Sequence, residues 1–134
     1  MLVAGIDGVN GVTLKVHFNR FFVQYVSGDF TGSFLQGTLD AADFDTGSML
    51  FSPGVVDLWA ARRGVTQTGI PMAAGETGVL CTLTFKAVAA TAGSTGAGTL
   101  TIDSADNMIT VCPTGGGACT QAAPTVGSGT VTAQ

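Results

Sequence analysis

Basic residues are scarce in this chain of 134 residues, which has five Lys and Arg side chains against nine Asp and Glu. These cations are scattered along the sequence apart from the pair Arg62 and Arg63, and the formal net charge is −4 at pH 7. A nucleic-acid partner needs clustered cations to meet its phosphates, and an anionic membrane surface attracts basic segments. We therefore expect neither a nucleic acid nor a membrane surface as the partner.

Long hydrophobic runs are also missing. No apolar run approaches the roughly 20 residues that a membrane-spanning helix needs, so we expect no membrane insertion. Residues 1–7 have neither the basic stretch nor the apolar core of a signal peptide. Strand-like sequence directly after Met1 indicates a segment excised from a longer protein. We expect residues 1–134 to form one domain.

What the chain does have is glycine, 20 residues of it, between short segments of alternating apolar and polar residues. In residues 79–89 the alternation places Val79, Cys81 and Leu83 on one face of an extended chain. The predicted strands are 2–6, 12–18, 21–26, 49–51, 55–61, 79–89, 99–102, 108–112 and 129–133. The acidic stretch 40–48 is predicted to be a turn. The pattern predicts an all-β, two-sheet β-sandwich with jelly-roll topology and about eight or nine strands.

The three cysteines divide into a pair and a single residue. Cys112 and Cys119 flank a Pro- and Gly-containing loop, which favours a disulfide and an oxidising, extracytoplasmic setting. Two free thiols in a loop are the alternative. Cys81 is predicted to be a small core residue in the middle of a strand. A closed zinc site needs about four ligands, and only His17 and Cys81 remain, so no metal site is expected.

Residues 45–48 spell Asp-Thr-Gly-Ser, which looks like the catalytic loop of an aspartic protease. That chemistry needs two carboxylates sharing one proton, so a protease using Asp45 would have to be a homodimer. A polar turn is the simpler interpretation. His17 lies on the polar face of its strand without a nucleophile signature beside it. We expect no enzymatic activity and no cofactor.

A calcium site in a sandwich loop is an alternative for Asp103, Asp106 and Asn107, which are more simply a hairpin turn. Trp59 has two interpretations as well. It could form part of a carbohydrate-stacking platform, but a core position in an alternating strand is the simpler one.

Several stretches together resemble the cohesin family of bacterial extracellular modules. They are residues 11–19, 23–30, 56–62, 75–87 and 129–132. The stretch 75–87 is the best match, because it joins a Gly and an aliphatic pair to an alternating segment ending in Phe-Lys-Ala. The resemblance implies a flattened jelly roll that binds a dockerin-type module through one sheet face without catalysis. Calcium in such complexes belongs to the partner.

The same resemblance implies the contact residues and the location. Carried over by motif, the partner-binding residues are Asn19, Leu58, Ala60 and Arg62. The parent protein would be secreted or on the bacterial cell surface, with the periplasm as the alternative. The chain departs from the family at Asn19-Arg20, where a cohesin usually has Asp-Pro. The N-terminal strand region looks shortened, which would expose a sheet edge for self-association.

Two other functions stay open beside the cohesin-like module. One is a carbohydrate-binding sandwich, and the other is a structural spacer of an adhesin or secretion-system protein. A homodimeric aspartic protease is the more remote alternative.

Overall fold

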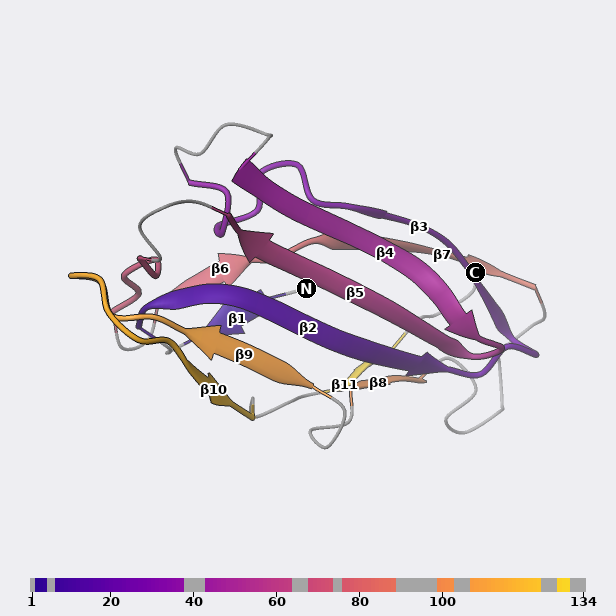
Figure 1. The fold of residues 1–134 in the computed structure, drawn as a ribbon. Helices are drawn as coiled ribbons and strands as arrows, with labels where there is room; N and C mark the ends of the chain where they lie inside the picture. The colour runs from indigo at the N-terminus through magenta and orange to yellow at the C-terminus, as the bar shows by residue number, and fades with distance from the viewer. Residues whose placement is uncertain are drawn as a thin grey trace.

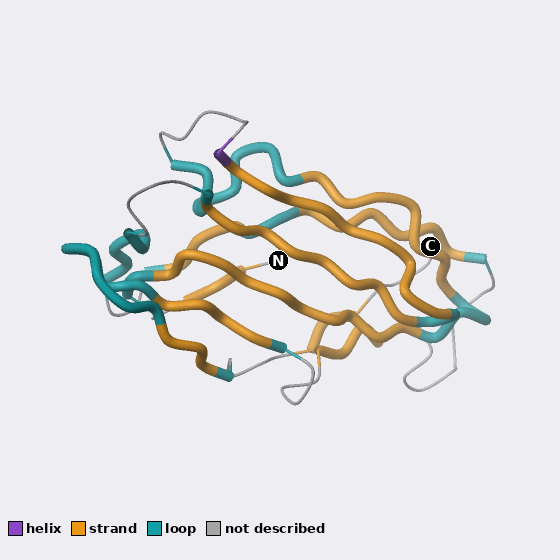
Figure 2. Tube along the Cα trace, viewed as in Figure 1, coloured by secondary structure: helices purple, strands orange, loops and turns teal. Residues whose placement is uncertain are grey.

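Antiparallel strands make up nearly all the regular structure of the chain. The computed structural model describes residues 2–4, 7–37, 43–63, 68–73, 76–88, 99–102, 107–123 and 128–130. The strands are β1 (Leu2–Ala4), β2 (Val9–Phe18), β3 (Val23–Asp29), β4 (Phe44–Ser52), β5 (Val55–Arg62), β6 (Thr77–Val79), β7 (Thr82–Ala87), β8 (Thr99–Ile102), β9 (Met108–Val111), β10 (Thr120–Ala122) and β11 (Ser128–Thr130). The predicted all-β class is confirmed, and loops gather at the two ends of the strands in Figure 2.

The main sheet has the strand order β10-β9-β2-β5-β4 (Figure 1). Its central strand β2 pairs with β5 along one side, from Gly11 opposite Ala61 to His17 opposite Val55. On its other side β2 pairs first with β9 and then with β8, which carries β11. Strands β4 and β5 form a hairpin closed by Pro53 and Gly54, which lie between the predicted strands 49–51 and 55–61.

Two short sheets, β3-β7 and β1-β6, lie behind the main sheet and form the second layer of the sandwich (Figure 1). The buried apolar side chains of the main sheet point toward this layer. They come from every second residue of β2 and β5, which is the period of an extended chain. The core cluster contains Val9, Val12, Leu14, Val16, Leu35, Leu58, Ala60, Leu80, Cys81 and Ile109.

Two local predictions are wrong. Residues 44–48, predicted as a turn, belong to β4, where they pair with β5. The predicted single strand 79–89 is divided between β6 and β7, because Leu80 and Cys81 are both buried and so cannot alternate between core and solvent. Cys81 is therefore a core residue, as predicted, but it lies between two strands. Strand β10 was not predicted.

Candidate partner-binding face

The outer face of the main sheet carries the side chains that alternate with the buried ones. On β5 these are Asp57, Trp59 and Ala61, and on β2 they are Thr13, Lys15 and His17. The register places Thr13 opposite Trp59 and Lys15 opposite Asp57. The face is therefore built around one Trp, one Thr and two opposite charges.

Large apolar side chains flank this centre on both sides. Met49 on β4 is opposite Asp57 and is 52% exposed, and Phe51 near the end of the same strand is 60% exposed. On the other side, Met108 of β9 is opposite Thr13 and is 41% exposed. Three exposed apolar side chains thus surround Trp59 and the charged pair on one sheet surface.

Trp59 is half-buried because its indole occupies the space above a glycine of the neighbouring strand. Gly47 is its cross-strand partner, and a Cβ added there would lie 2.1 Å from Trp59 Cζ2. The prediction of a core position is therefore wrong, because Trp59 alternates with the buried residues of β5 and so lies on the outer face. Its packing against Gly47 keeps the aromatic ring low on the outer face.

Lys15 connects the polar centre of the face to its apolar flank. Its Nζ lies 5.1 Å from the centroid of the Phe51 ring, within the range of a cation–π contact. Its backbone N–H donates to Asn107 Oδ1 at 2.6 Å, which ties β2 to the start of β9. Asn107 was a candidate calcium ligand together with Asp103 and Asp106, which lie outside the described residues.

The predicted contact residues Leu58 and Ala60 do not lie on this face. Both are 0% exposed and belong to the core cluster, so the prediction that they contact a partner is wrong. They share the inward parity of Val56, which is also fully buried. The predicted alternation along β5 is correct, but the prediction placed the buried side chains on the outer face.

The other two predicted contact residues lie at opposite ends of the β2–β5 pair, as the register requires. Asn19 is exposed in the turn after β2, where its Oδ1 accepts a hydrogen bond from the Phe21 N–H. Arg62 ends β5, and its Nη1 donates to the Leu35 carbonyl at 3.0 Å. Partial burial lowers the pKa of the Arg62 guanidinium. The structure therefore does not bring Asn19 and Arg62 into one contact site.

Asp45 of the protease-like sequence lies on β4 next to an arginine. Its Oδ2 accepts from Arg63 Nη2 at 2.6 Å, and both side chains are exposed. An exposed ion pair of this kind contributes little stability. Asp45 is therefore a strand residue whose side chain forms a salt bridge on the surface.

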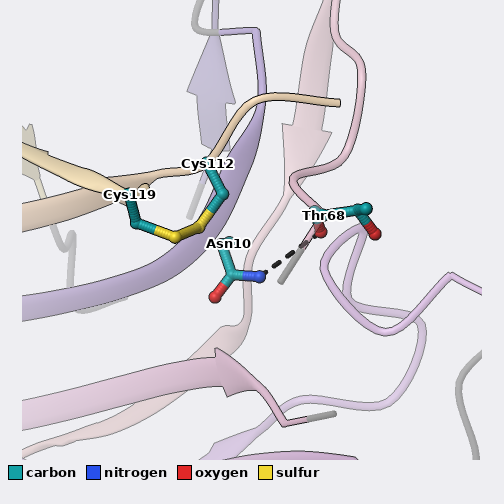
Figure 3. Close-up of a disulfide and its surroundings, with 4 residues drawn as sticks. All are labelled: Asn10, Thr68, Cys112 and Cys119. Atoms are coloured by element: carbon teal, nitrogen blue, oxygen red, sulfur yellow. Dashed lines mark hydrogen bonds between the residues drawn. A yellow bond between two sulfur atoms is a disulfide. The ribbon is translucent and has the colours of Figure 1, made fainter. Parts of the chain in front are cut away.

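The disulfide between Cys112 and Cys119 is confirmed, and it closes the loop between β9 and β10 (Figure 3). Beside it, the Asn10 side-chain amide donates to the Thr68 carbonyl at 3.3 Å (Figure 3). The Cys112 N–H donates to the Gly8 carbonyl at 2.8 Å. The disulfide and these two hydrogen bonds are among the contacts that hold this end of the main sheet.

The described residues contain neither a metal-binding cluster nor a membrane-spanning helix. No three His, Cys, Asp or Glu side chains in the described ranges gather as a metal site would require. Within the same ranges there is no helix long and apolar enough to cross a membrane.

Comparison with known proteins gives no assignment. No protein-family model matches this sequence, and no curated protein is significantly similar to it.

Proposed function

We propose that this chain is a non-catalytic protein-interaction module, resembling a cohesin, that binds a dockerin-type partner through the outer face of the main sheet. The observation that carries the proposal is the group of exposed Met49, Phe51 and Met108 side chains around Trp59. Protein interfaces are enriched in Trp, Phe and Met at their centres, with few charged residues there. The face has these residue types, although the charged side chains of Lys15 and Asp57 also lie at its centre.

The shape of the face supports the same function. The sheet surface near Trp59 has few protruding side chains, because its residues there include Gly11, Gly47 and Ala61. Met side chains adapt to a partner surface because they are unbranched and flexible. A low surface with adaptable apolar side chains suits docking of another folded module.

A hollow next to this face adds a place for an anchoring side chain. Its volume is 340 Å³, and from β4 it is lined by Leu50, which is opposite the buried Val56, so the hollow lies between the two layers at the edge of the main sheet. The other lining residues come from the end of β2, the β2–β3 turn, the first half of β3, the β4–β5 turn and the residue after β7. They are Phe18, Arg20, Val23, Gln24, Tyr25, Pro53, Gly54 and Val88. An apolar side chain of the partner would be buried there.

The setting proposed for this module is outside the cytoplasm. Disulfides persist in oxidising compartments, so the Cys112–Cys119 bond supports a secreted or cell-surface protein, with the periplasm as the alternative. The jelly-roll topology and the self-association of an edge strand stay predictions of the cohesin resemblance.

Titration calorimetry of the disulfide-bonded domain against calcium-loaded dockerin modules tests the proposed function. We expect binding to at least one dockerin type, and we expect Phe51→Ser to weaken it about tenfold or more, because an exposed apolar contact is lost at the interface. Val26→Ser is the matched control, since Val26 is an apolar residue of similar exposure on the other layer.

The proposal fails if no dockerin type binds, or if binding is equally weakened by the two substitutions. Unchanged thermal unfolding of both variants would establish that the folded domain is being compared, because both positions are on the surface.

A further inference from the structure

Strand β4 has hydroxyl side chains at positions that should face the core. Thr46 is opposite Ala60, and Ser48 is opposite Leu58, and both β5 residues are fully buried. The register therefore places the side chains of Thr46 and Ser48 on the inner face of β4, toward the second layer. Polar residues at inward positions are unfavourable unless they meet water, a hydrogen-bond partner or a ligand.

The two hydroxyls line an open cleft between the two layers. Strand β3 runs beside β4 here (Figure 1), but each strand pairs through its backbone with a different neighbour. Their direct link is a side-chain hydrogen bond, in which the Tyr25 hydroxyl donates to Ser48 Oγ at 2.7 Å. Beyond this bond the layers separate, leaving a volume of 540 Å³. That volume lies within the range of small-molecule sites, roughly 300–1,000 Å³.

The lining of the cleft combines hydrogen-bonding groups with aromatic rings. Its residues are Gly28, Asp29, Phe30, Thr31, Gln36, Phe44, Thr46, Gly47 and Ser48. They include one carboxylate, one amide and three hydroxyls, beside two phenylalanines. Among the lining residues that the structure describes there is no Lys or Arg to provide a counter-charge for an anionic ligand such as a phosphate.

The carboxylate of Asp29 is held in place at the rim. Its Oδ1 accepts a hydrogen bond from the Thr31 N–H at 2.9 Å. Hydrogen bonds from the Thr31 backbone and side chain lower the pKa of Asp29, so this group is ionised at neutral pH. An ionised carboxylate has two oxygens and accepts hydrogen bonds from two neighbouring hydroxyls of one ligand.

We infer that this cleft binds a short neutral saccharide, at a site separate from the outer face of the main sheet. Adjacent sugar hydroxyls would donate to Asp29, while the Gln36 amide and the hydroxyls of Thr46 and Ser48 would satisfy others. The rings of Phe30 and Phe44 offer the apolar surface that the C–H faces of a sugar pack against. The inference does not depend on the proposed protein partner.

Saturation-transfer NMR with the intact domain tests the inference, using neutral tetrasaccharides of glucose, mannose, galactose and N-acetylglucosamine. We expect at least one of them to bind. Asp29→Asn should weaken that saccharide about tenfold or more, because a charge-assisted hydrogen bond is lost. Thr46→Val should also weaken it, since the side-chain shape is kept while the hydroxyl is removed.

Two controls locate the binding. Asp45→Asn removes another exposed carboxylate of β4 that lies outside the cleft lining, and it should leave the affinity unchanged. Trp59→Ala should also leave it unchanged, because Trp59 is on the outer face. The inference is overturned if no tetrasaccharide binds at about 10 mM, or if Trp59→Ala abolishes binding while Asp29→Asn and Thr46→Val do not.

Discussion

At the scale of single residues, the pair Gly47 and Trp59 determines the relief of the proposed binding face. The indole takes the space that a side chain on β4 would need, so a glycine is required at its cross-strand position. The requirement is steric and does not come from the backbone dihedral angles, because Gly47 lies in a regular strand with a negative φ angle. This explains a glycine in the middle of a nine-residue strand.

Gly47→Ala should therefore destabilise the domain by about 1–3 kcal/mol, because the added methyl group overlaps the indole. Urea unfolding measures the loss, and the tryptophan emission should shift as the ring moves. In a Trp59→Ala background the same substitution should cost much less, since the clash is gone. Equal costs in both backgrounds would contradict the steric explanation. Gly115→Ala, in open space, serves as the control.

The buried thiol of Cys81 provides a second prediction at this scale. Burial raises the pKa of Cys81 above its ordinary value of 9.0, so the folded state favours the neutral thiol. The thiol of the unfolded chain ionises first as the pH increases. The stability that depends on the neutral thiol is therefore present below about pH 9 and is lost as the pH rises through the folded pKa.

We expect Ellman's reagent at pH 8 to react with the native protein on the order of 100-fold more slowly than with the unfolded protein. The signal belongs to Cys81, because Cys112 and Cys119 are joined in the disulfide. Equal reaction rates in the two states would show that the thiol is accessible. Replacing Cys81 with Ala should remove this part of the decline in unfolding free energy above pH 9.

At the scale of elements, the sequence predicts strands well where one face is consistently apolar. In β5, the set Val56, Leu58 and Ala60 is apolar, while Asp57 interrupts the other set. The charge of Asp57 was the available signal for which set faces solvent. The family resemblance had instead placed Leu58 and Ala60 on the outside.

The failures at β4 and β6–β7 come from contacts that the local pattern does not contain. Residues 45–48 have a turn-like composition, but they pair with β5, and Asp45 also pairs with Arg63. At Leu80 and Cys81 the chain crosses the core, so two successive side chains are buried. The apolar run Met49-Leu50-Phe51 predicts a short strand, and its exposure, which the sequence pattern does not contain, makes it part of the proposed binding face.

The hairpin of β9 and β10 gives the prediction at this scale. Replacing both Cys112 and Cys119 with Ala should lower the unfolding free energy by about 2–3 kcal/mol. Without the disulfide the short loop is no longer closed in the unfolded chain, so the conformational entropy of the unfolded chain increases. Urea unfolding with and without reductant measures this effect. The wild type should lose stability on reduction, whereas the double variant should not respond. An equal response of both proteins would show that the reductant acts elsewhere.

At the scale of the whole molecule, stability depends on the layer of side chains between the sheets. The sandwich class was predictable because alternating segments with frequent glycine turns leave few other ways to bury one face. The pairing of β2 with both β9 and β8 was not predictable, since the register depends on loops far apart in the sequence.

Comparing a buried leucine with an exposed one tests how much burial contributes to stability. Leu58→Ala should cost about 2–5 kcal/mol, because a fully buried side chain leaves a cavity between the layers. Leu50→Ala should change stability by less than about 1 kcal/mol, because that side chain is half-exposed at the sheet edge. Urea unfolding of both variants checks the difference. Similar losses would contradict the assignment of Leu58 to the interior.

The pairing of β4 with β5 shifts register between Leu50 and Ser52, beside its three exposed apolar residues. A straight edge strand with this composition would be a template for adding further strands, and so for fibril growth. A bulge bends and twists the strand, which interrupts the regular row of free backbone groups. This irregularity works against the addition of a further strand at the end of β4 where the apolar side chains are exposed.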